Sequence, residues 1–277
     1  MHSRVSIVTG ATSGIGLLTA EALARRGDRV WILGRDEKRT REAADHIQAF
    51  TGNPPEALVG DLSSLAEVRR LADSLRSKLD RIDVLVNNAG AAFPKRALSA
   101  DGIEMTFALN HFGHFLLTNR LIDLLEAGRP ARVVNVASDA HRMARKVDEA
   151  NLKGEAGYAG WRSYAQSKLA NILFSNELAR RLEGRGVTSN ALHPGFVRTR
   201  FFQKEGLGAQ VTKLAAGLFA IPPEQGAKTS IYAAISPEVE GITGAYFEKG
   251  RRSRTTKAAQ DPGAAARLWD LSTSWTA

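Results

Sequence analysis

Tyr164 and Lys168 are the residues of this chain whose types and spacing point most clearly to chemistry. They stand four positions apart, so a helix would place both side chains on one face. A free tyrosine has a pKa of about 10 and is a reluctant proton donor near neutral pH, whereas an adjacent ammonium favours the phenolate. We therefore expect this pair to transfer a proton.

A glycine-rich segment far upstream, Thr9–Gly16, predicts a nucleotide as the second reactant. Its glycines directly follow a strand-like run and precede a helical pattern. Glycines let the backbone turn tightly and approach a pyrophosphate, and the following helix N-terminus favours the negative charge. A nucleotide beside a proton donor predicts hydride transfer at a carbonyl or alcohol. The expected cofactor contacts in this segment are Gly10, Thr12, Ser13, Gly14, Ile15 and Gly16.

Strand-like and helical runs alternate along the chain and must position these residues. We expect strands over 5–8, 30–33, 57–59, 84–86, 132–137, 187–192 and 245–247, and long helices over 104–126 and 161–182. Alternation of this kind predicts an α/β fold, a Rossmann-type doubly wound parallel sheet of about seven strands with helices on both faces. No repeat or linker divides the sequence, so we expect a single domain, 1–277, with a lid over about 200–225.

The end of the second strand bears on the choice of cofactor. A site that prefers NAD usually has an acid there, which binds the ribose hydroxyls. In this chain Gly34 takes that place and Arg35 follows, a residue that can hold a 2′-phosphate, while Lys38 and Arg39 add positive charge. We therefore expect NADP(H) in preference to NAD(H). Asp36 keeps NAD(H) open, because in another register it would serve as the ribose acid.

The ends of the third and fourth strands carry further polar residues. Asp61 is expected either to accept a hydrogen bond from the adenine amino group or to cap the next helix. Asparagine side chains at the fourth strand end tie loop backbone together, and Gly90 keeps a close approach to the cofactor open. The expected cofactor contacts at these two strand ends are Asp61, Leu62, Asn87, Ala89 and Gly90.

Composition excludes several classes of site. The chain has no cysteine, which rules out disulfides and thiolate chemistry, and its histidines lack convincing metal-site spacing, so we expect no metal. The net charge is +9, but acidic residues interleave with the basic ones, and the basic run 250–257 lacks aromatic residues, so we expect no nucleic-acid partner. We see no signal peptide and no apolar stretch long enough to span a membrane, and we expect a cytoplasmic protein.

With these pieces in order, the sequence resembles the short-chain dehydrogenase/reductase superfamily. The resemblance covers nearly the whole chain and rests on Thr9–Gly16, Asp61, Asn87–Gly90, Asn110, Ser138, Tyr164 with Lys168, and Pro194–Gly195. Four longer segments are similar to the retinol dehydrogenase and WW-domain-containing oxidoreductase branch, namely Leu109–Thr118, Val133–His141, Tyr164–Asn171 and Arg267–Ser272.

The resemblance implies a role for each chemical residue. Tyr164 would be the general acid and base, and Ser138 would hydrogen-bond the developing alkoxide. Lys168 would bind the nicotinamide ribose and lower the pKa of Tyr164, while Asn110 would hold a water that links Lys168 to solvent. The nicotinamide end of the cofactor would meet Pro194, Gly195, Val197 and Thr199, which implies transfer of the pro-S hydride.

Two functions follow as alternatives. The first is an NADP(H)-dependent oxidoreductase acting on a small-to-medium, apolar carbonyl compound or alcohol. The second is a non-catalytic NADP(H)-binding sensor or scaffold with the same fold. In relatives, the helices equivalent to those around Asn110 and Tyr164 form a four-helix dimer interface, so we expect a homodimer or tetramer, with a monomer as the alternative.

Overall fold

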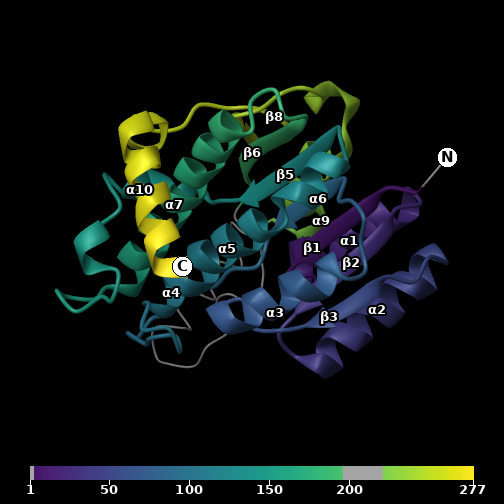
Figure 1. Cartoon of the computed structure of the whole chain (residues 1–277), viewed down its shortest axis with the longest axis horizontal. Coiled ribbons are helices and arrows are strands. Elements are labelled where there is room, and N and C mark those ends of the chain that lie inside the picture. Colours follow the sequence, from purple (N-terminus) through teal and green to yellow (C-terminus); the bar gives the residue numbers. More distant parts are fainter. Residues whose placement is uncertain (1–2, 196–220) are drawn as a thin grey trace.

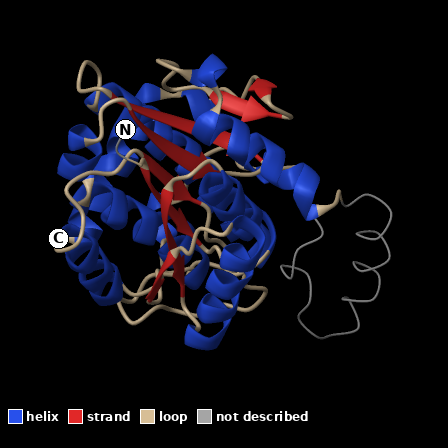
Figure 2. Cartoon of the chain, turned by 90° about the vertical axis from the view of Figure 1, so that its right-hand side faces the viewer, coloured by secondary structure: helices blue, strands red, loops and turns tan. Residues whose placement is uncertain are grey.

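One sheet runs through the chain in this computed structural model, which describes residues 3–195 and 221–277. The strand order is β3-β2-β1-β4-β5-β6-β7-β8. Helices cover both faces of the sheet (Figure 2). The strands are β1 (Val5–Thr9), β2 (Arg29–Gly34), β3 (Glu56–Val59), β4 (Val84–Asn87), β5 (Ala131–Val136), β6 (Val187–His193), β7 (Tyr246–Glu248) and β8 (Arg251–Arg252).

The sheet confirms the expected fold class and adds one strand to it. β1 to β7 pair in parallel and lie within one or two residues of the expected segments. β8 pairs antiparallel with β7 through Phe247 and Glu248. The expectation of about seven strands missed β8 because two exposed arginines carry no apolar alternation.

Capping residues determine where the helices α2 and α3 begin and end. Asp36 caps the start of α2, because its carboxylate accepts a hydrogen bond from the Arg39 N–H, and α2 ends at Gly52 with a left-handed φ of 69°. Ser64 caps α3. The helices are α1 (Gly14–Arg25), α2 (Glu37–Thr51), α3 (Leu65–Arg76), α4 (Met105–Phe107), α5 (Gly113–Arg120), α6 (Ile122–Ala127), α7 (Gly160–Arg181), α9 (Pro223–Ile235) and α10 (Pro262–Thr276).

The expected helix over 104–126 is interrupted. The short α4 leads into a π-helical turn, Ala108–Phe112, which is followed by α5, and Leu121 separates α5 from α6. The π turn contains Asn110, and isolated π turns are frequent at functional sites. Apolar periodicity continues through the whole segment, so the sequence pattern did not indicate this wider turn.

The C-terminal helix α10 packs beside α7 (Figure 1). The Trp269 ring lies 5.0 Å from the Phe115 ring of α5 and 5.9 Å from the Phe174 ring of α7, measured between centroids. Ser272 Oγ lies 2.8 Å from His111 Nε2. α10 therefore covers part of the helical face on which a partner subunit was expected.

Two expectations lie wholly or partly outside the described residues. Val197, Thr199 and most of the lid at about 200–225 fall there.

Among the helices that the structure does describe, none has both the length and the apolar character needed to cross a membrane.

Candidate active site

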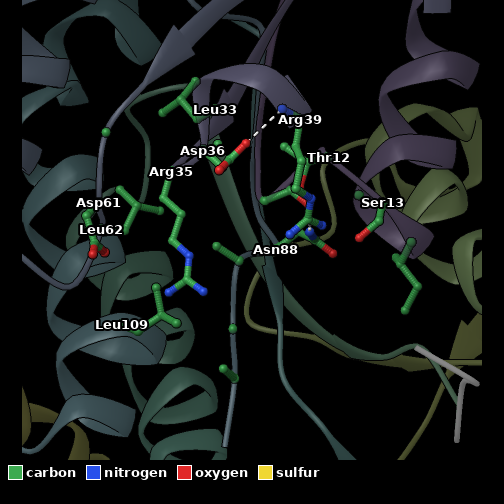
Figure 3. A pocket seen from close by; sticks show the side chains of 18 of the residues that line it. Thr12, Ser13, Leu33, Arg35, Asp36, Arg39, Asp61, Leu62, Asn88 and Leu109 are labelled. Carbon is green, nitrogen blue, oxygen red and sulfur yellow. Dashed lines mark hydrogen bonds between the residues drawn. The ribbon is translucent and has the colours of Figure 1, made fainter. Parts of the chain in front are cut away.

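A cavity of about 340 Å³ lies at the carboxyl ends of β1 to β4, where the strand order reverses between β1 and β4 (Figure 3). This is the place where open α/β sheets bind ligands. The expected contacts in its wall are Gly10, Thr12, Ser13, Ile15, Gly16, Arg35, Asp61, Leu62, Ala89 and Gly90. Gly14 begins α1 and does not line the cavity.

The glycine-rich turn packs directly against the loop after β4. Gly10 has a φ of +65°, and a Cβ on it would lie 2.8 Å from Ala89 Cα. A Cβ on Gly16 would lie 2.4 Å from Asn88 Nδ2 and 2.5 Å from the Gly10 carbonyl oxygen. Only glycine fits both positions, so the backbone can turn tightly here and a pyrophosphate can approach it at the start of α1.

Asn88 was not among the expected cofactor contacts, but it confirms that an asparagine side chain at this strand end ties loop backbone together. Its Nδ2 donates to the carbonyl oxygens of Thr9 (2.8 Å) and Gly10 (3.2 Å), and it lines the cavity. Asn87 was expected to bind the cofactor, but its buried side chain points into the core and donates to Thr118 Oγ1 and Asn135 Oδ1. Adjacent strand residues face opposite sides, so the motif alone did not say which asparagine meets the pocket.

The end of β2 is closed to an acidic side chain. A Cβ on Gly34 would lie 2.3 Å from Thr40 Oγ1 and 2.5 Å from Thr12 Cγ2. The Asp36 carboxylate caps α2 through a 2.9 Å hydrogen bond from the Arg39 N–H, although Asp36 also borders the cavity. An acidic side chain therefore has no room at position 34, and the carboxylate of Asp36 is already used to cap α2.

Arg35 and Asp61 face the cavity from neighbouring strand ends. Figure 3 shows the Arg35 side chain extending into the cavity, and within the described chain Arg35 forms no ion pair. Asp61 Oδ1 accepts hydrogen bonds from Ser63 N (2.9 Å) and Ser63 Oγ (2.8 Å), whereas Ser64 caps α3. The alternative of Asp61 as helix cap is therefore wrong, and Arg35 is an available cation at this end of the cavity.

Ser138, Tyr164 and Lys168 come together beside the cavity. Ser138 follows β5 and is hydrogen-bonded to Tyr164, which lies in the first turns of α7. Lys168 Nζ is 5.6 Å from the centroid of the Tyr164 ring and donates to the Val136 carbonyl at 3.0 Å. A Cβ on Gly90 would lie 3.3 Å from Lys168 Nζ, so Gly90 connects this cluster to the cavity wall.

Burial shifts the pKa of Tyr164 and that of Lys168 in opposite directions, each towards the neutral form of its own side chain. Desolvation raises the pKa of Tyr164 to about 12, and the hydrogen bond with Ser138 acts in the opposite direction. Desolvation lowers the pKa of Lys168 to about 8. We expected Lys168 to lower the pKa of Tyr164, but burial of the phenol outweighs any such effect. At neutral pH Tyr164 keeps its proton and Lys168 keeps its charge.

Asn110 clamps the next piece of cavity wall. Its Oδ1 accepts from the Ala91 N–H (2.9 Å), and its Nδ2 donates to the Ala91 carbonyl (3.0 Å) and to Ser167 Oγ (2.9 Å). Asn110 is fully buried. Its side chain thus joins the cavity wall to α7, and its expected role in holding a water stays a prediction.

Glu104 is a further residue that the sequence interpretation missed. It is 1% exposed, and its two carboxylate oxygens accept five hydrogen bonds. Ser163 Oγ donates to one oxygen at 2.5 Å and the Tyr158 hydroxyl to the other at 3.0 Å, while the rest come from the first turn of α4. Ser163 immediately precedes Tyr164, so Glu104 fixes the start of α7. The one sequence signal for Glu104 is that it is an acidic residue within an otherwise apolar segment, where a carboxylate is rare.

Two buried histidines support the site from behind. His114 Nδ1 lies 3.1 Å from the Asn110 carbonyl oxygen and Nε2 lies 3.0 Å from Thr9 Oγ1. Because a carbonyl only accepts, Nδ1 carries the proton and Nε2 accepts from the Thr9 hydroxyl. Burial lowers the pKa of His114 to about 4 and that of His111 to about 3. Both imidazoles are therefore neutral at physiological pH.

The remaining expected residues lie near the end of β6. Pro194 and Gly195 follow it, and Gly195 has a φ of +94°. His193 accepts a hydrogen bond from the Asp139 N–H through Nδ1 (3.1 Å), and this bond holds the segment after Ser138 in place.

In the two described ranges no cluster of histidine and acidic side chains could hold a metal ion.

Comparisons with known proteins agree with this geometry. The family model for short chain dehydrogenases matches residues 4–209. Mouse retinol dehydrogenase 14 is 41% identical over 98% of this chain and 85% of its own length. An uncharacterised protein of Mycobacterium paratuberculosis has a TM-score of 0.80 at 35% identity, covering 99% of this chain and 93% of that one.

A second solved structure, titled as the NADP active-site complex of Pseudomonas aeruginosa RhlG, has a TM-score of 0.70 at 30% identity and covers 89% of this chain and 96% of its own. Family model, relatives and solved structures extend over nearly all of the sequence. This chain therefore belongs to the short-chain dehydrogenase/reductase superfamily, is similar to its retinol dehydrogenases, and is an oxidoreductase that acts on an alcohol or carbonyl group with a nicotinamide cofactor.

Proposed function

We propose that the chain interconverts an apolar carbonyl compound and the corresponding alcohol, with NADP(H) as cofactor and Tyr164 as general acid and base. The observation that carries this proposal is the Ser138–Tyr164 hydrogen bond, placed beside Lys168 and next to Gly90 in the cavity wall. Two hydroxyls that meet beside this cavity can hold one substrate oxygen between them.

The preference for NADP(H) is supported by the end of β2. Gly34 has no room for a side chain, Asp36 is used as a helix cap, and Arg35 extends into the cavity without an ion-pair partner in the described chain. A guanidinium can bind a 2′-phosphate through two parallel charge-assisted hydrogen bonds. NAD(H) remains the alternative cofactor, for which Arg35 would contribute little.

Each catalytic side chain has a distinct task in the reduction direction. When bound, the reduced nicotinamide supplies the hydride. Tyr164, which keeps its proton at neutral pH, donates it to the substrate oxygen, and Ser138 donates a hydrogen bond to the same oxygen. The nearby Lys168 ammonium stabilises the resulting phenolate. General acid catalysis of this kind contributes about 10²- to 10⁴-fold in rate. Oxidation runs the same proton transfers in reverse.

Spectrophotometry of the reduced nicotinamide tests the proposal. NADPH and NADH are offered in parallel with a panel of aldehydes, ketones and retinal, and Tyr164→Phe serves as the blank. Turnover with NADPH that disappears in the variant supports the reductase. Tight NADPH binding without turnover on any substrate would instead favour the sensor or scaffold, for which the Ser138, Tyr164 and Lys168 set has no evident use.

The assembly, the single domain 1–277 and the cytoplasmic location also stay proposals. α10 covers part of the α5 and α7 face, so we propose that a homodimer or tetramer, if it forms, uses another surface. Light scattering of the full chain separates these states from a monomer of 29.9 kDa. Cell fractionation tests the location.

A further inference from the structure

We propose that His114 is a positioning residue that couples the two ends of the site, with one imidazole nitrogen serving the nucleotide end and the other serving the catalytic end. This inference rests on the function proposed above, because it gives His114 an effect on both cofactor affinity and turnover. His114 is 2% exposed, lies in α5 and does not line the cavity. Its effect on the site must therefore pass through its two hydrogen-bond partners, Thr9 and Asn110.

The Thr9 hydroxyl forms the first connection. Its Oγ1 accepts hydrogen bonds from the backbone N–H groups of Asn88 (2.9 Å) and Ala89 (3.0 Å). These two bonds use both lone pairs, so the hydroxyl proton must point to another acceptor, and His114 Nε2 at 3.0 Å is nearer than the Val86 carbonyl oxygen at 3.3 Å. His114 thus holds the hydroxyl in the orientation that receives both N–H groups. Because Asn88 and Ala89 line the cavity, this bond supports the nucleotide end.

The Asn110 carbonyl forms the second connection. It accepts a hydrogen bond from His114 Nδ1 at 3.1 Å. Asn110 lies in the π turn, and its side chain donates to Ser167 Oγ at 2.9 Å. Ser167 Oγ in turn donates to the Tyr164 carbonyl oxygen at 2.8 Å. By holding the Asn110 backbone, His114 therefore fixes the side chain that ties the π turn to the part of α7 that carries Tyr164 and Lys168.

The position of the imidazole proton gives each nitrogen one task. The Asn110 carbonyl only accepts, and the Thr9 hydroxyl has only its proton left to offer, so the two bonds together require a neutral ring with the proton on Nδ1. A ring that carries a proton on Nε2 would lose the bond from Thr9. Neither nitrogen can take over the task of the other.

Two substitutions separate these tasks, because an amide side chain can replace either nitrogen but not both. In His114→Asn the amide N–H can replace Nδ1 towards Asn110, and Thr9 loses its acceptor. In His114→Gln the longer side chain brings an amide oxygen to the place of Nε2 towards Thr9, and the Asn110 carbonyl loses its donor. We expect His114→Asn to weaken NADPH binding by about 3- to 10-fold with kcat nearly unchanged, as for the loss of one hydrogen bond. His114→Gln should lower kcat by about 3- to 10-fold with NADPH binding nearly unchanged.

Calorimetric titration with NADPH and steady-state kinetics at saturating cofactor measure the two quantities in the full chain. Asn119→Ala is the matched control, because Asn119 Nδ2 also donates to a carbonyl four positions earlier, that of Phe115, and Asn119 does not line the cavity. It should change neither quantity. A merely structural role of His114 predicts parallel losses of binding and turnover in both variants, and that result would overturn the coupling. Wild-type binding and turnover in both variants would also overturn it.

Failure of the proposed function is a separate outcome. If the wild type turns over no substrate, NADPH titration still tests the nucleotide end, where binding weakened in His114→Asn but not in His114→Gln would support the coupling and equal binding would overturn it. Nitrogen NMR of the histidine side chains tests the link in the wild type, and it remains decisive if both variants misfold. A proton on Nδ1 alone supports the coupling, whereas a proton on Nε2 of His114 at neutral pH would overturn it.

Discussion

The two ends of the site are built in different ways. At the ends of β1 to β3, the cavity is a glycine cradle with charged side chains at its border, and Arg35 is exposed and unpaired in the described chain. At the ends of β4 and β5, Ser138 and Tyr164 are half-buried residues whose hydroxyls are hydrogen-bonded to each other. Behind them lie the fully buried side chains of Lys168 and Asn110.

This difference separates two properties of the enzyme. A cradle made by absent side chains, with Arg35 beside it and without an ion pair in the described chain, can change its affinity for a ligand without disturbing the core. A reactive cluster that depends on buried hydrogen bonds has its pKa values set by desolvation, so altering it changes reactivity and stability together. We therefore expect the nucleotide end to determine cofactor affinity and the catalytic end to determine turnover. The predictions below test this separation.

The largest effect is expected for the two hydroxyls. Ser138→Ala and Tyr164→Phe should each lower kcat by about 10²- to 10⁴-fold, because both contact the substrate oxygen in the proposed mechanism. Since the two hydroxyls are hydrogen-bonded to each other, the double variant should be little worse than Tyr164→Phe alone. Steady-state kinetics with saturating NADPH measures this. Fully additive losses would mean that the two groups act separately.

Acid should destabilise the framework behind the catalytic end. Below pH 6.5 the unfolded chain binds protons at His111 and His114, whereas the folded chain binds them only near pH 3 and pH 4. The free energy of unfolding should therefore fall as the pH drops from 6.5 towards 4, by about 2 kcal/mol per histidine at pH 5.

Urea unfolding at several pH values measures this loss. His111→Asn, which can keep a hydrogen bond to Ser272, should reduce the pH slope by the contribution of one proton. An unchanged slope in this variant would show that His111 is not held neutral in the folded chain.

Arg35 tests the nucleotide end. Arg35→Ala should weaken NADPH binding by about 10- to 100-fold and leave NADH binding nearly unchanged, because only NADPH carries the 2′-phosphate. Fluorescence titration of both cofactors measures the ratio. Arg41→Ala, an exposed arginine of α2 outside the cavity wall, is the control and should alter neither affinity. A loss of similar size for both cofactors would argue against phosphate recognition.

The smallest effect is expected for Ser163→Ala, which removes one of the five donors to Glu104 and leaves the other four. Stability should fall by about 1–2 kcal/mol, as for one hydrogen bond to a charged group, and kcat should fall by a few fold while NADPH affinity is unchanged. Ser77→Ala, which removes an exposed hydrogen bond to the Ser74 carbonyl at the end of α3, is the control. If Ser163→Ala and Ser77→Ala change kcat equally, Glu104 does not position Tyr164.

The nucleotide end could be predicted from the sequence further than the catalytic end. Gly10, Gly16, Arg35 and Asp61 follow strands that apolar runs mark clearly, and all four line the cavity. Their contacts depend on position along a strand, which is a local property. Asn87 is the exception, because a strand end does not reveal which of two adjacent side chains faces the ligand.

The framework of the catalytic end could not be predicted in the same way. Glu104 meets Ser163 across 59 positions, and Asn110 meets Ser167 across 57. Such pairs leave no trace in periodicity, and neither does the π turn that contains Asn110. The direction of the Tyr164 pKa shift was wrong for a related reason, since burial is a property of the folded chain and not of the Tyr164–Lys168 spacing.

A double-mutant cycle of Arg35→Ala and Tyr164→Phe tests the separation of affinity and turnover most directly. NADPH affinity and kcat at saturating cofactor are measured for the wild type, both single variants and the double variant. We predict that Arg35→Ala weakens NADPH binding and keeps kcat within about threefold, that Tyr164→Phe does the reverse, and that the two effects add. Loss of both binding and turnover in either single variant would contradict the separation of the two ends.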